Sequence, residues 1–433
     1  MTTIDIEIQA ARADPPQHVV VIGAGIVGAA SAIELLRDGH RVTIVEPGEP
    51  GGEQAASYGN GACLSPSSVV PMSYPGIWKK VPGYVLDPLG PLAIRWRYFP
   101  RLIPWLLRFL GAGSTEAKIH AAGRVLRPLV INCPERHKKL AEEAGVGDLI
   151  QKQGLLYAYP SRADFEADSL AWRVRAETGV KWLEFDENEV RQREPALDRR
   201  YTFGVLVEEG GQCLNPGGYV AALVRHAQNE KAELRRARAT GFRIEQGRLR
   251  AVRTDAGDIA CDKAVICAGA WSKTLAAEAG DHVVMESERG YHVLIEDPAS
   301  GPRHPILATD TKGSITMTAG RLRIAGQVEL AGLEAAPNWQ RAQILLGLLK
   351  RTFPALGDVA ADKVKVWMGH RPATPDALPI IGHASGSSDI VYGFGHGHIG
   401  LAAGPVSGRL VADLVSGKPP CIDPAPYSAR RFS

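Results

Sequence analysis

The chain has 433 residues, with 45% hydrophobic and 22% charged residues, which excludes a disordered or collagen-like protein. Fifty Lys and Arg residues against 47 Asp and Glu residues give a net charge of +3, and this near-balance argues against nucleic-acid binding. At about 150 residues per domain, the length predicts roughly three folding units or two larger ones.

Cysteine usage and the N-terminus indicate where the protein resides. The six cysteines are irregularly spaced and include no CxxC pair, which disfavours a disulfide framework and a zinc site. Residues 1–17 contain acidic residues and no apolar core, which argues against a signal peptide. No uncharged apolar stretch of about 18 residues occurs, so we expect no membrane span and a cytoplasmic protein.

The first predicted elements form a strand–turn–helix–strand unit at residues 18–22, 26–38 and 41–45. Such a unit begins a parallel sheet. Residues 66–110 are rich in proline, glycine and aromatic residues and predict no particular element.

Within that stretch, residues 91–110 combine apolar and aromatic side chains with four arginines. One interpretation is a surface that lies on the inner face of the cytoplasmic membrane. The interpretation we favour is a buried helical segment that is broken by proline.

Further along the chain, apolar spacing predicts helices at residues 115–145, 164–178, 216–229, 339–349 and 404–415. Alternation predicts a hairpin at 241–258 that turns near 245–247, and strands at 263–267, 282–295, 314–328 and 364–368. We expect strands 282–295 and 314–328 to share an antiparallel sheet. Because nucleotide-fold signals recur without a clean linker, we predict one discontinuous domain and a second domain formed by the insertions.

The string GAGIVG follows the first strand and opens the first helix. In this setting Gly23 permits a tight turn, Gly25 lets the backbone approach a pyrophosphate, and Gly28 lets helix and strand pack closely. The N–H groups at the helix start, in the segment that contains Ile26 and Val27, can bind phosphate oxygens. The string therefore predicts a dinucleotide site.

Glu46 ends the second strand, about 20 residues after the glycines, where a carboxylate accepts the two ribose hydroxyls of an adenosine. A carboxylate there would repel a 2′-phosphate, which disfavours NADP. The turn alone does not distinguish NAD from FAD. FAD proteins often return late in the chain to hold the flavin ring, and later segments fit that pattern.

Two of these later segments are strings with unusual composition. In VICAGAWS, small residues after a strand let the backbone pass close to a nucleotide, although a plain glycine turn has the same pattern. In GHRPATPDALPIIG, three prolines fix the backbone around Arg371. An arginine held in this way suits bidentate capture of a carboxylate, although a surface arginine on a turn is an equal alternative.

The string GFGHGHIG leads into the last predicted helix. Its alternating glycines allow close approach to a flat ring, and the helix start would stabilise negative charge on the edge of a reduced flavin. His396 and His398 have no apparent third partner for a metal ion, so we expect structural hydrogen bonds and no metal site.

Together with ASYGNGACLSP and ERGYHV, these strings resemble the FAD-dependent D-amino acid oxidase superfamily, especially its bacterial D-amino acid dehydrogenases. The resemblance covers nearly the whole chain. It implies an α/β fold with a discontinuous Rossmann-like FAD-binding domain and a substrate domain that contains a large mixed or antiparallel β-sheet and helices. The expected FAD-binding domain comprises residues 17–90, 200–280 and 365–433, and the substrate domain residues 91–199 and 281–364.

The resemblance also implies roles for individual residues. Arg371 would bind the substrate carboxylate, Tyr291 would lie near the substrate, and the ring of His292 would change the pocket. This ring places D-alanine in doubt and favours D-proline or hydroxy-D-proline. The residues expected to hold FAD are Gly23, Gly25, Ile26, Val27, Gly28, Glu46, Ser57, Asn60, Gly61, Gly269, Trp271, Gly395, Gly397, His398, Ile399 and Gly400.

The implied reaction oxidises the Cα–N bond of an amino acid to an imine by hydride transfer to flavin N5, and water then gives a 2-oxo acid. The electrons would pass to a membrane quinone or another non-oxygen acceptor. Three alternatives remain open: a glycine- or sarcosine-type oxidase that uses oxygen, a non-catalytic flavoprotein subunit, and an NAD-linked dehydrogenase.

Overall fold

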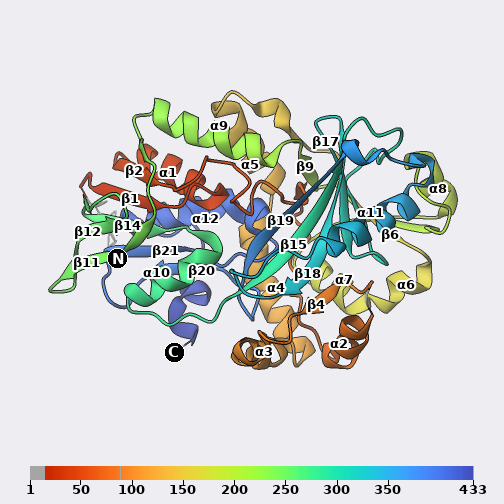
Figure 1. Cartoon of the computed structure of the whole chain (residues 1–433), viewed down its shortest axis with the longest axis horizontal. Coiled ribbons are helices and arrows are strands. Elements are labelled where there is room, and N and C mark those ends of the chain that lie inside the picture. Colours follow the sequence, from red (N-terminus) through yellow and green to blue (C-terminus); the bar gives the residue numbers. More distant parts are fainter. Residues whose placement is uncertain (1–14, 88, 433) are drawn as a thin grey trace, which may run out of the picture.

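A mostly parallel six-stranded sheet forms the left half of the molecule in Figure 1. The computed structural model describes residues 15–87 and 89–432, so the N-terminal segment that argues against a signal peptide lies largely outside the described residues. The strand order is β10 (Glu233–Arg235), β2 (Arg41–Val45), β1 (His18–Ile22), β14 (Lys263–Ile266), β21 (Ile390–Phe394) and β20 (Ile380–His383), with only β20 antiparallel to its neighbour.

Both faces of this sheet are covered, because its strands are apolar on both sides. Val19 and Val21 of β1 point into one core, and Val20 and Ile22 point into the other. The first core is closed by α1 (Ile26–Arg37), α4 (Glu116–Val130), α5 (Cys133–Glu143), α9 (Pro216–Asn229) and α12 (Gly400–Val415). The second is closed by α10 (Ser272–Glu278) and by a small sheet of β11 (Ala239–Glu245), β12 (Arg248–Thr254) and β13 (Ile259–Ala260).

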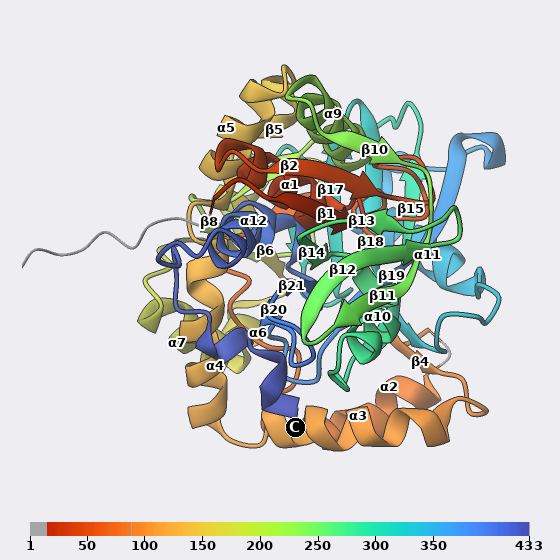
Figure 2. The same ribbon diagram turned by 90° about the vertical axis from the view of Figure 1, so that its left-hand side faces the viewer.

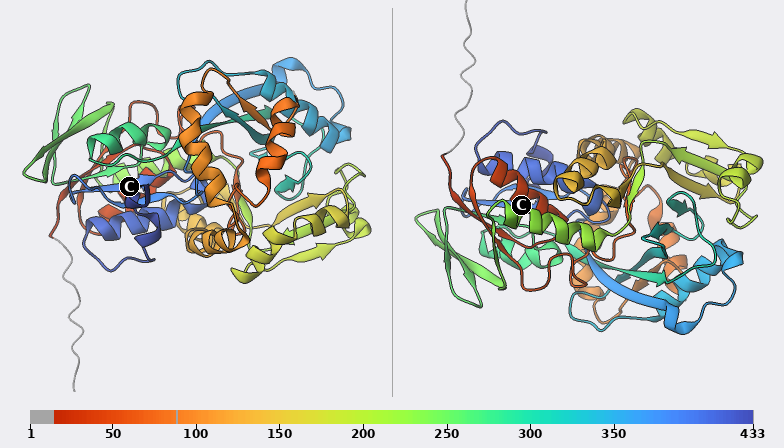
Figure 3. Two further views of the ribbon diagram at one scale, coloured as in Figure 1. Left: turned by 90° about the horizontal axis from the view of Figure 1, so that it is seen from below. Right: turned by 90° about the horizontal axis from the view of Figure 1, so that it is seen from above.

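A nine-stranded mixed sheet forms the other half, and the views from below and above in Figure 3 show the two halves side by side. Its order is β19 (Val364–Ala373), β15 (Glu286–Ile295), β18 (Arg321–Leu330), β17 (Gly313–Thr318), β16 (Ile306–Ala308), β6 (Leu155–Tyr159), β8 (Phe203–Val207) and β7 (Leu183–Phe185), and β4 (Leu92–Ile94) pairs with β18. Apolar residues of α11 (Gln340–Thr352) pack against it. The predicted α/β fold with a large mixed sheet is confirmed.

Shorter elements complete the nine-stranded half and join it to the first. They are α6 (Arg162–Ala167), α7 (Ser169–Glu177), α8 (Glu187–Arg193), and a small sheet of β3 (Cys63–Leu64), β9 (Gly211–Cys213) and β5 (Ile150–Gln151). The expected domain boundaries stay a prediction. Strands β8 and β19 both belong to the nine-stranded sheet, where β8 lies between β6 and β7 and β19 lies beside β15. The expected FAD-binding domain nevertheless included β8 and nearly all of β19.

Several elements are divided more finely than the periodicity predicts. The helix expected at 115–145 is two helices, because Asn132 adopts a left-handed conformation (φ +54°) before Pro134. The strand expected at 314–328 is a hairpin of β17 and β18, which turns at Ala319 and Gly320 with φ of +51° and +78°. The hairpin of β11 and β12 turns at Gln246 and Gly247, as predicted.

The segment 77–112 forms α2 (Ile77–Leu86), β4 and α3 (Phe99–Ala112), and α3 lies along the bottom edge of the molecule in Figure 2. The favoured interpretation of 91–110 as a buried, proline-broken helix is wrong in two respects. The helix α3 continues through Pro104, and within it only Leu102 and Trp105 are buried. Within the described residues, none of the helices has the length and apolar character needed to cross a bilayer.

Candidate active site

A cavity of about 1480 Å³ lies between the two sheets. A typical small-molecule pocket has a volume of about 300–1,000 Å³, so this cavity has room for a dinucleotide and a second molecule. All of the predicted site residues except Gly28 and His292 line it: Gly23, Gly25, Ile26, Val27, Glu46, Ser57, Asn60, Gly61, Gly269, Trp271, Tyr291, Arg371, Gly395, Gly397, His398, Ile399 and Gly400.

The glycine turn between β1 and α1 is built as its sequence predicts. Gly23 has φ +102°, and a Cβ on it would lie 2.5 Å from the backbone oxygen of Cys267. A Cβ on Gly28 would lie 1.9 Å from the backbone oxygen of Gly23, so Gly28 supports the turn from behind without lining the cavity. A Cβ on Gly25 would have its nearest neighbour at 3.6 Å, the Oγ of Ser57, which is an ordinary van der Waals contact, so the backbone there is not crowded by the chain itself.

Glu46 fixes the second strand to this turn. Its Oε2 accepts a hydrogen bond from the N–H of Ala24 at 2.9 Å, and its Oε1 accepts one from the N–H of Gly48 at 3.0 Å. The side chain of Ser57 lies at the start of α1, where its Oγ accepts a hydrogen bond from the N–H of Ile26 at 3.2 Å. The carboxylate, the hydroxyl and the helix N-terminus therefore meet at one end of the cavity.

The loop that follows Ser57 lies against the large sheet. The backbone oxygen of Asn60 accepts a hydrogen bond from Arg323 Nη1 at 2.7 Å, and that of Gly61 accepts one from Ser314 Oγ at 3.1 Å. A Cβ on Gly59 would lie 1.9 Å from the ring of Trp367, so glycine is required there. This loop joins the two halves of the molecule along the cavity wall.

Arg371 is held on the cavity wall by backbone carbonyl groups. Its Nη1 donates to the oxygen of Gln327 at 3.0 Å, and its Nη2 donates to that of Gly326 at 3.4 Å. The guanidinium lies over Gly290, where a Cβ would approach Arg371 Cζ to 2.2 Å. Burial lowers the pKa of Arg371, and Glu288 opposes that effect. Since an arginine has five N–H donors, the group keeps donors for a ligand.

The two other predicted catalytic residues already have protein partners. Tyr291 is buried, donates its hydroxyl to Glu329 Oε2 at 2.5 Å, and accepts a hydrogen bond from the N–H of Asn338 at 2.9 Å. Burial and the bond to Glu329 raise the pKa of Tyr291 to about 12. The role of Tyr291 near the substrate remains a prediction.

His292 does not contact the cavity, which corrects the expectation that its ring shapes the substrate pocket. Its Nδ1 lies 3.2 Å from the oxygen of Gly59, and its ring stacks on Trp367 with the ring centroids 5.2 Å apart. Burial, followed by the charge of Arg323, lowers the pKa of His292 to about 3. Trp367 lines the cavity in place of His292.

Among the charged side chains that the structure adds to the cavity wall is the carboxylate of Glu288, which the sequence interpretation did not assign. It lines the cavity beside Arg371, and its Oε2 lies 2.7 Å from His398 Nε2. His396 instead lies 2.8 Å from Ser407 Oγ, so the two histidines have different partners. The string ERGYHV contains Glu288, but the same strand also carries Glu286, Ser287, Arg289 and His292, so nothing in the sequence singled out Glu288.

These residues fit FAD. The open glycine turn, Glu46 and the start of α1 can hold the adenosine and the pyrophosphate, since helix N-termini bind phosphate. At the other end of the cavity, Gly395, Gly397 and the start of α12 can hold the flavin ring. An ideal Cβ on Gly397 would meet no atom within 4 Å, which leaves space for a flat group.

Comparisons with known proteins agree with this fit. The DAO family model, described as FAD dependent oxidoreductase, matches residues 18–414. A D-amino-acid oxidase from Bradyrhizobium diazoefficiens is 57% identical over 417 residues, covering 96% of this chain and 99% of the relative. A D-amino acid dehydrogenase from Paramagnetospirillum magneticum is 32% identical over 427 residues, which cover 96% of this chain and 99% of the relative.

A glycine oxidase from Geobacillus kaustophilus has the same fold, with a TM-score of 0.74 at 23% identity, covering 96% of this chain and 99% of that structure. The family match spans the glycine turn, the cavity wall and most of α12. The chain belongs to the DAO family of FAD-dependent oxidoreductases, and FAD is its cofactor.

Proposed function

We propose that the chain oxidises the Cα–N bond of D-amino acids to imines, which water hydrolyses to 2-oxo acids. The observation that carries the proposal is the half-buried Arg371, whose guanidinium lies on the cavity wall with donors to spare. The names of the relatives at 57% and 32% identity support D-amino acids as the substrate class. FAD, when it is bound, takes up the hydride from the substrate.

The contribution of the chain to this reaction is positioning. Arg371 would bind the α-carboxylate by two parallel hydrogen bonds and so fix the direction of the Cα–H bond. Orientation of this kind lowers a barrier by several kcal/mol. The anchor is rigid, because the Gln327 and Gly326 carbonyls restrain the guanidinium before a substrate arrives.

We propose oxygen as the electron acceptor, because the relative at 57% identity is named an oxidase. The preference for D-proline or hydroxy-D-proline depended on the ring of His292, which does not contact the cavity, so that preference loses its support and the proposal extends to D-amino acids as a class. With FAD-loaded protein under air, we expect a D-amino acid to yield one peroxide for each 2-oxo acid, and its L-enantiomer to yield none. Turnover that requires a quinone or a dye would contradict oxygen as the acceptor.

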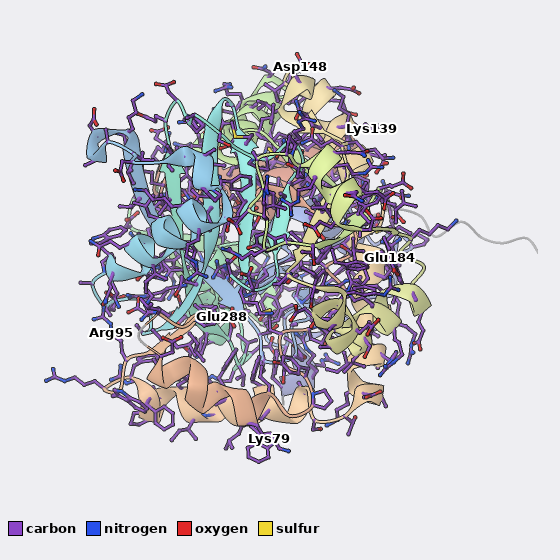
Figure 4. All side chains as sticks on the ribbon, turned by 90° about the vertical axis from the view of Figure 1, so that its right-hand side faces the viewer. Lys79, Arg95, Lys139, Asp148, Glu184 and Glu288 are labelled. Carbon is purple, nitrogen blue, oxygen red and sulfur yellow. The ribbon has the colours of Figure 1, made fainter. Side chains whose placement is uncertain are left out.

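The second candidate is a membrane quinone, as the sequence analysis expected. One face of α2 and α3 closes the cavity through residues such as Ile77 and Phe109. Other side chains of this segment are exposed and are apolar or cationic: Lys79 of α2, Trp96 and Arg97 of the turn before α3, and Arg101, Ile103, Leu107 and Arg108 of α3. Figure 4 shows Lys79 at the outer margin of the molecule. Apolar residues interleaved with cations favour contact with anionic lipids.

Co-sedimentation with anionic lipid vesicles tests this surface. If the surface binds lipid, Leu107→Ser should weaken binding at least about tenfold, because an exposed leucine gains about 1.5–3 kcal/mol on burial. Leu183→Ser is the matched control, because Leu183 is also exposed but lies in β7, in another part of the molecule. Equal binding by the two variants, or no binding by the unmodified chain at low salt, would contradict the membrane candidate.

A further inference from the structure

Two opposite charges lie side by side on the cavity wall. Glu288 and Arg371 are directly paired residues of the antiparallel strands β15 and β19, so both side chains project from the same face of the sheet. Both residues line the cavity. Glu288 is 6% exposed, and Figure 4 shows it inside the molecule, whereas Lys79 and Arg95 lie at the margin.

These two groups form no direct salt bridge with each other within the described part of the chain, and each has its own partners. The guanidinium of Arg371 donates to the carbonyl oxygens of Gln327 and Gly326. The carboxylate of Glu288 uses Oε2 for His398 Nε2, and its Oε1 has no hydrogen-bond partner within residues 15–87 and 89–432. A carboxylate has about four lone-pair sites, so Glu288 retains most of its capacity to accept hydrogen bonds.

Glu288 is ionised in this setting. Burial raises the pKa of Glu288, but the charge and hydrogen bond of His398 and the charge of Arg371 outweigh burial and lower the pKa below its usual value. The Oε1 atom of Glu288 is not enclosed by the protein and is open to the cavity, where a hydrogen-bond donor can reach it. A cationic N–H donor on a ligand in the cavity would satisfy that oxygen.

We propose that Glu288 binds the α-amino group of the substrate, in its ammonium form, while Arg371 binds the α-carboxylate. This inference rests on the proposed function. Directly opposed residues in a sheet have their Cβ atoms about 4.5–5.5 Å apart, which suits the short spacing between the two charges of an amino acid zwitterion. His398 acts as a positioning residue, since its bond to Oε2 leaves Oε1 available to the ligand.

This arrangement explains how the site would distinguish an amino acid from a 2-hydroxy acid or a simple carboxylate. A ligand without the ammonium group would leave Glu288 Oε1 beside a carboxylate ligand, with no donor from that ligand. Sites built to hydrogen-bond a polar group strongly reject analogues that lack it. Glu288 would therefore select the chemical class of the substrate, whereas Arg371 alone would accept any carboxylate.

Calorimetric binding to the FAD-loaded protein tests this assignment without turnover. The probes are 2-aminoisobutyrate, which has no hydrogen on Cα and is therefore not oxidised at that bond, and isobutyrate, which lacks the amino group. The wild type should bind 2-aminoisobutyrate more tightly than isobutyrate. Glu288→Gln should weaken 2-aminoisobutyrate about ten- to hundredfold, the range expected for a hydrogen bond between charged groups, without weakening isobutyrate.

Glu286→Gln is the matched control. Glu286 lies two residues earlier on β15, is also buried, and accepts a hydrogen bond from the hydroxyl of Tyr98 at 2.7 Å, but it does not line the cavity. This control should bind both probes as the wild type does. If Glu288→Gln fails to fold, the wild-type affinities alone still test the assignment. The assignment is overturned if the wild type binds isobutyrate as tightly as 2-aminoisobutyrate.

The outcomes separate this assignment from the proposed function. Suppose that both probes bind and that Arg371→Ala weakens both. If Glu288→Gln then weakens the two probes equally, or weakens neither, only the role of Glu288 is overturned. If the wild type binds neither probe, the proposed function and the assignment are both overturned. The same holds if both probes bind and Arg371→Ala changes the affinity for neither.

Discussion

Arg371→Ala should raise KM for a D-amino acid about 10²- to 10⁴-fold, with FAD still bound. The estimate follows from the loss of two charge-assisted hydrogen bonds at about 1.5–3 kcal/mol each. FAD should remain, because the contacts of Arg371 are with Gln327 and Gly326 in β18, and the glycine turn lies elsewhere in the cavity. Steady-state kinetics, together with the flavin absorbance of each preparation, measure both effects.

Arg371→Lys is the informative companion variant. A lysine keeps the positive charge but loses the planar pair of donors, so its KM should fall between those of the wild type and Arg371→Ala. Unchanged KM and kcat in Arg371→Ala would remove this arginine from the substrate site. Loss of FAD from the same variant would show that Arg371 supports the cofactor.

Gly23→Ala should abolish FAD binding. The new Cβ would lie 2.5 Å from the backbone oxygen of Cys267, and φ of +102° is strained for any residue with a side chain. Relief of the clash requires the turn to move away from β14, which displaces the N–H groups that face the pyrophosphate. The purified variant should contain little FAD and take up little on dialysis against it, as measured by absorbance.

Gly39→Ala separates this effect from general destabilisation. Gly39 also has a positive φ of +87°, but a Cβ on it would meet no atom within 4 Å. Its left-handed backbone costs about 1–2 kcal/mol with alanine, so we expect a lower melting temperature and a full complement of FAD. Full FAD content in Gly23→Ala would contradict the role of the turn, and loss of FAD from both variants would point to instability instead.

The features that the sequence predicted well depend on neighbouring residues. The glycine turn follows from the string GAGIVG between β1 and α1, and the β11–β12 hairpin follows from Gln246 and Gly247 at its turn. In both places a glycine with positive φ meets a local backbone requirement that the sequence shows directly, although Gly23 also packs against the distant Cys267.

The features that it missed depend on contacts between distant parts of the chain. Glu288 becomes a cavity residue only because β15 pairs with β19 and because His398, 110 residues away, reaches its carboxylate. His292 is removed from the cavity by Trp367, which stacks on it from another strand. The exposed face of α3 carries Ile103 and Leu107 beside Arg101 and Arg108, so its apolar residues alone did not distinguish an exposed helix from a buried one.

The central claim is that this chain holds FAD in the cavity and reduces it with D-amino acids. The most direct test mixes the purified, FAD-loaded protein with each enantiomer of a panel of amino acids in the absence of oxygen. We predict that the yellow colour bleaches with at least one D-amino acid and persists with its L-enantiomer. A protein that takes up no FAD, or whose flavin stays oxidised with every D-amino acid, would contradict the account.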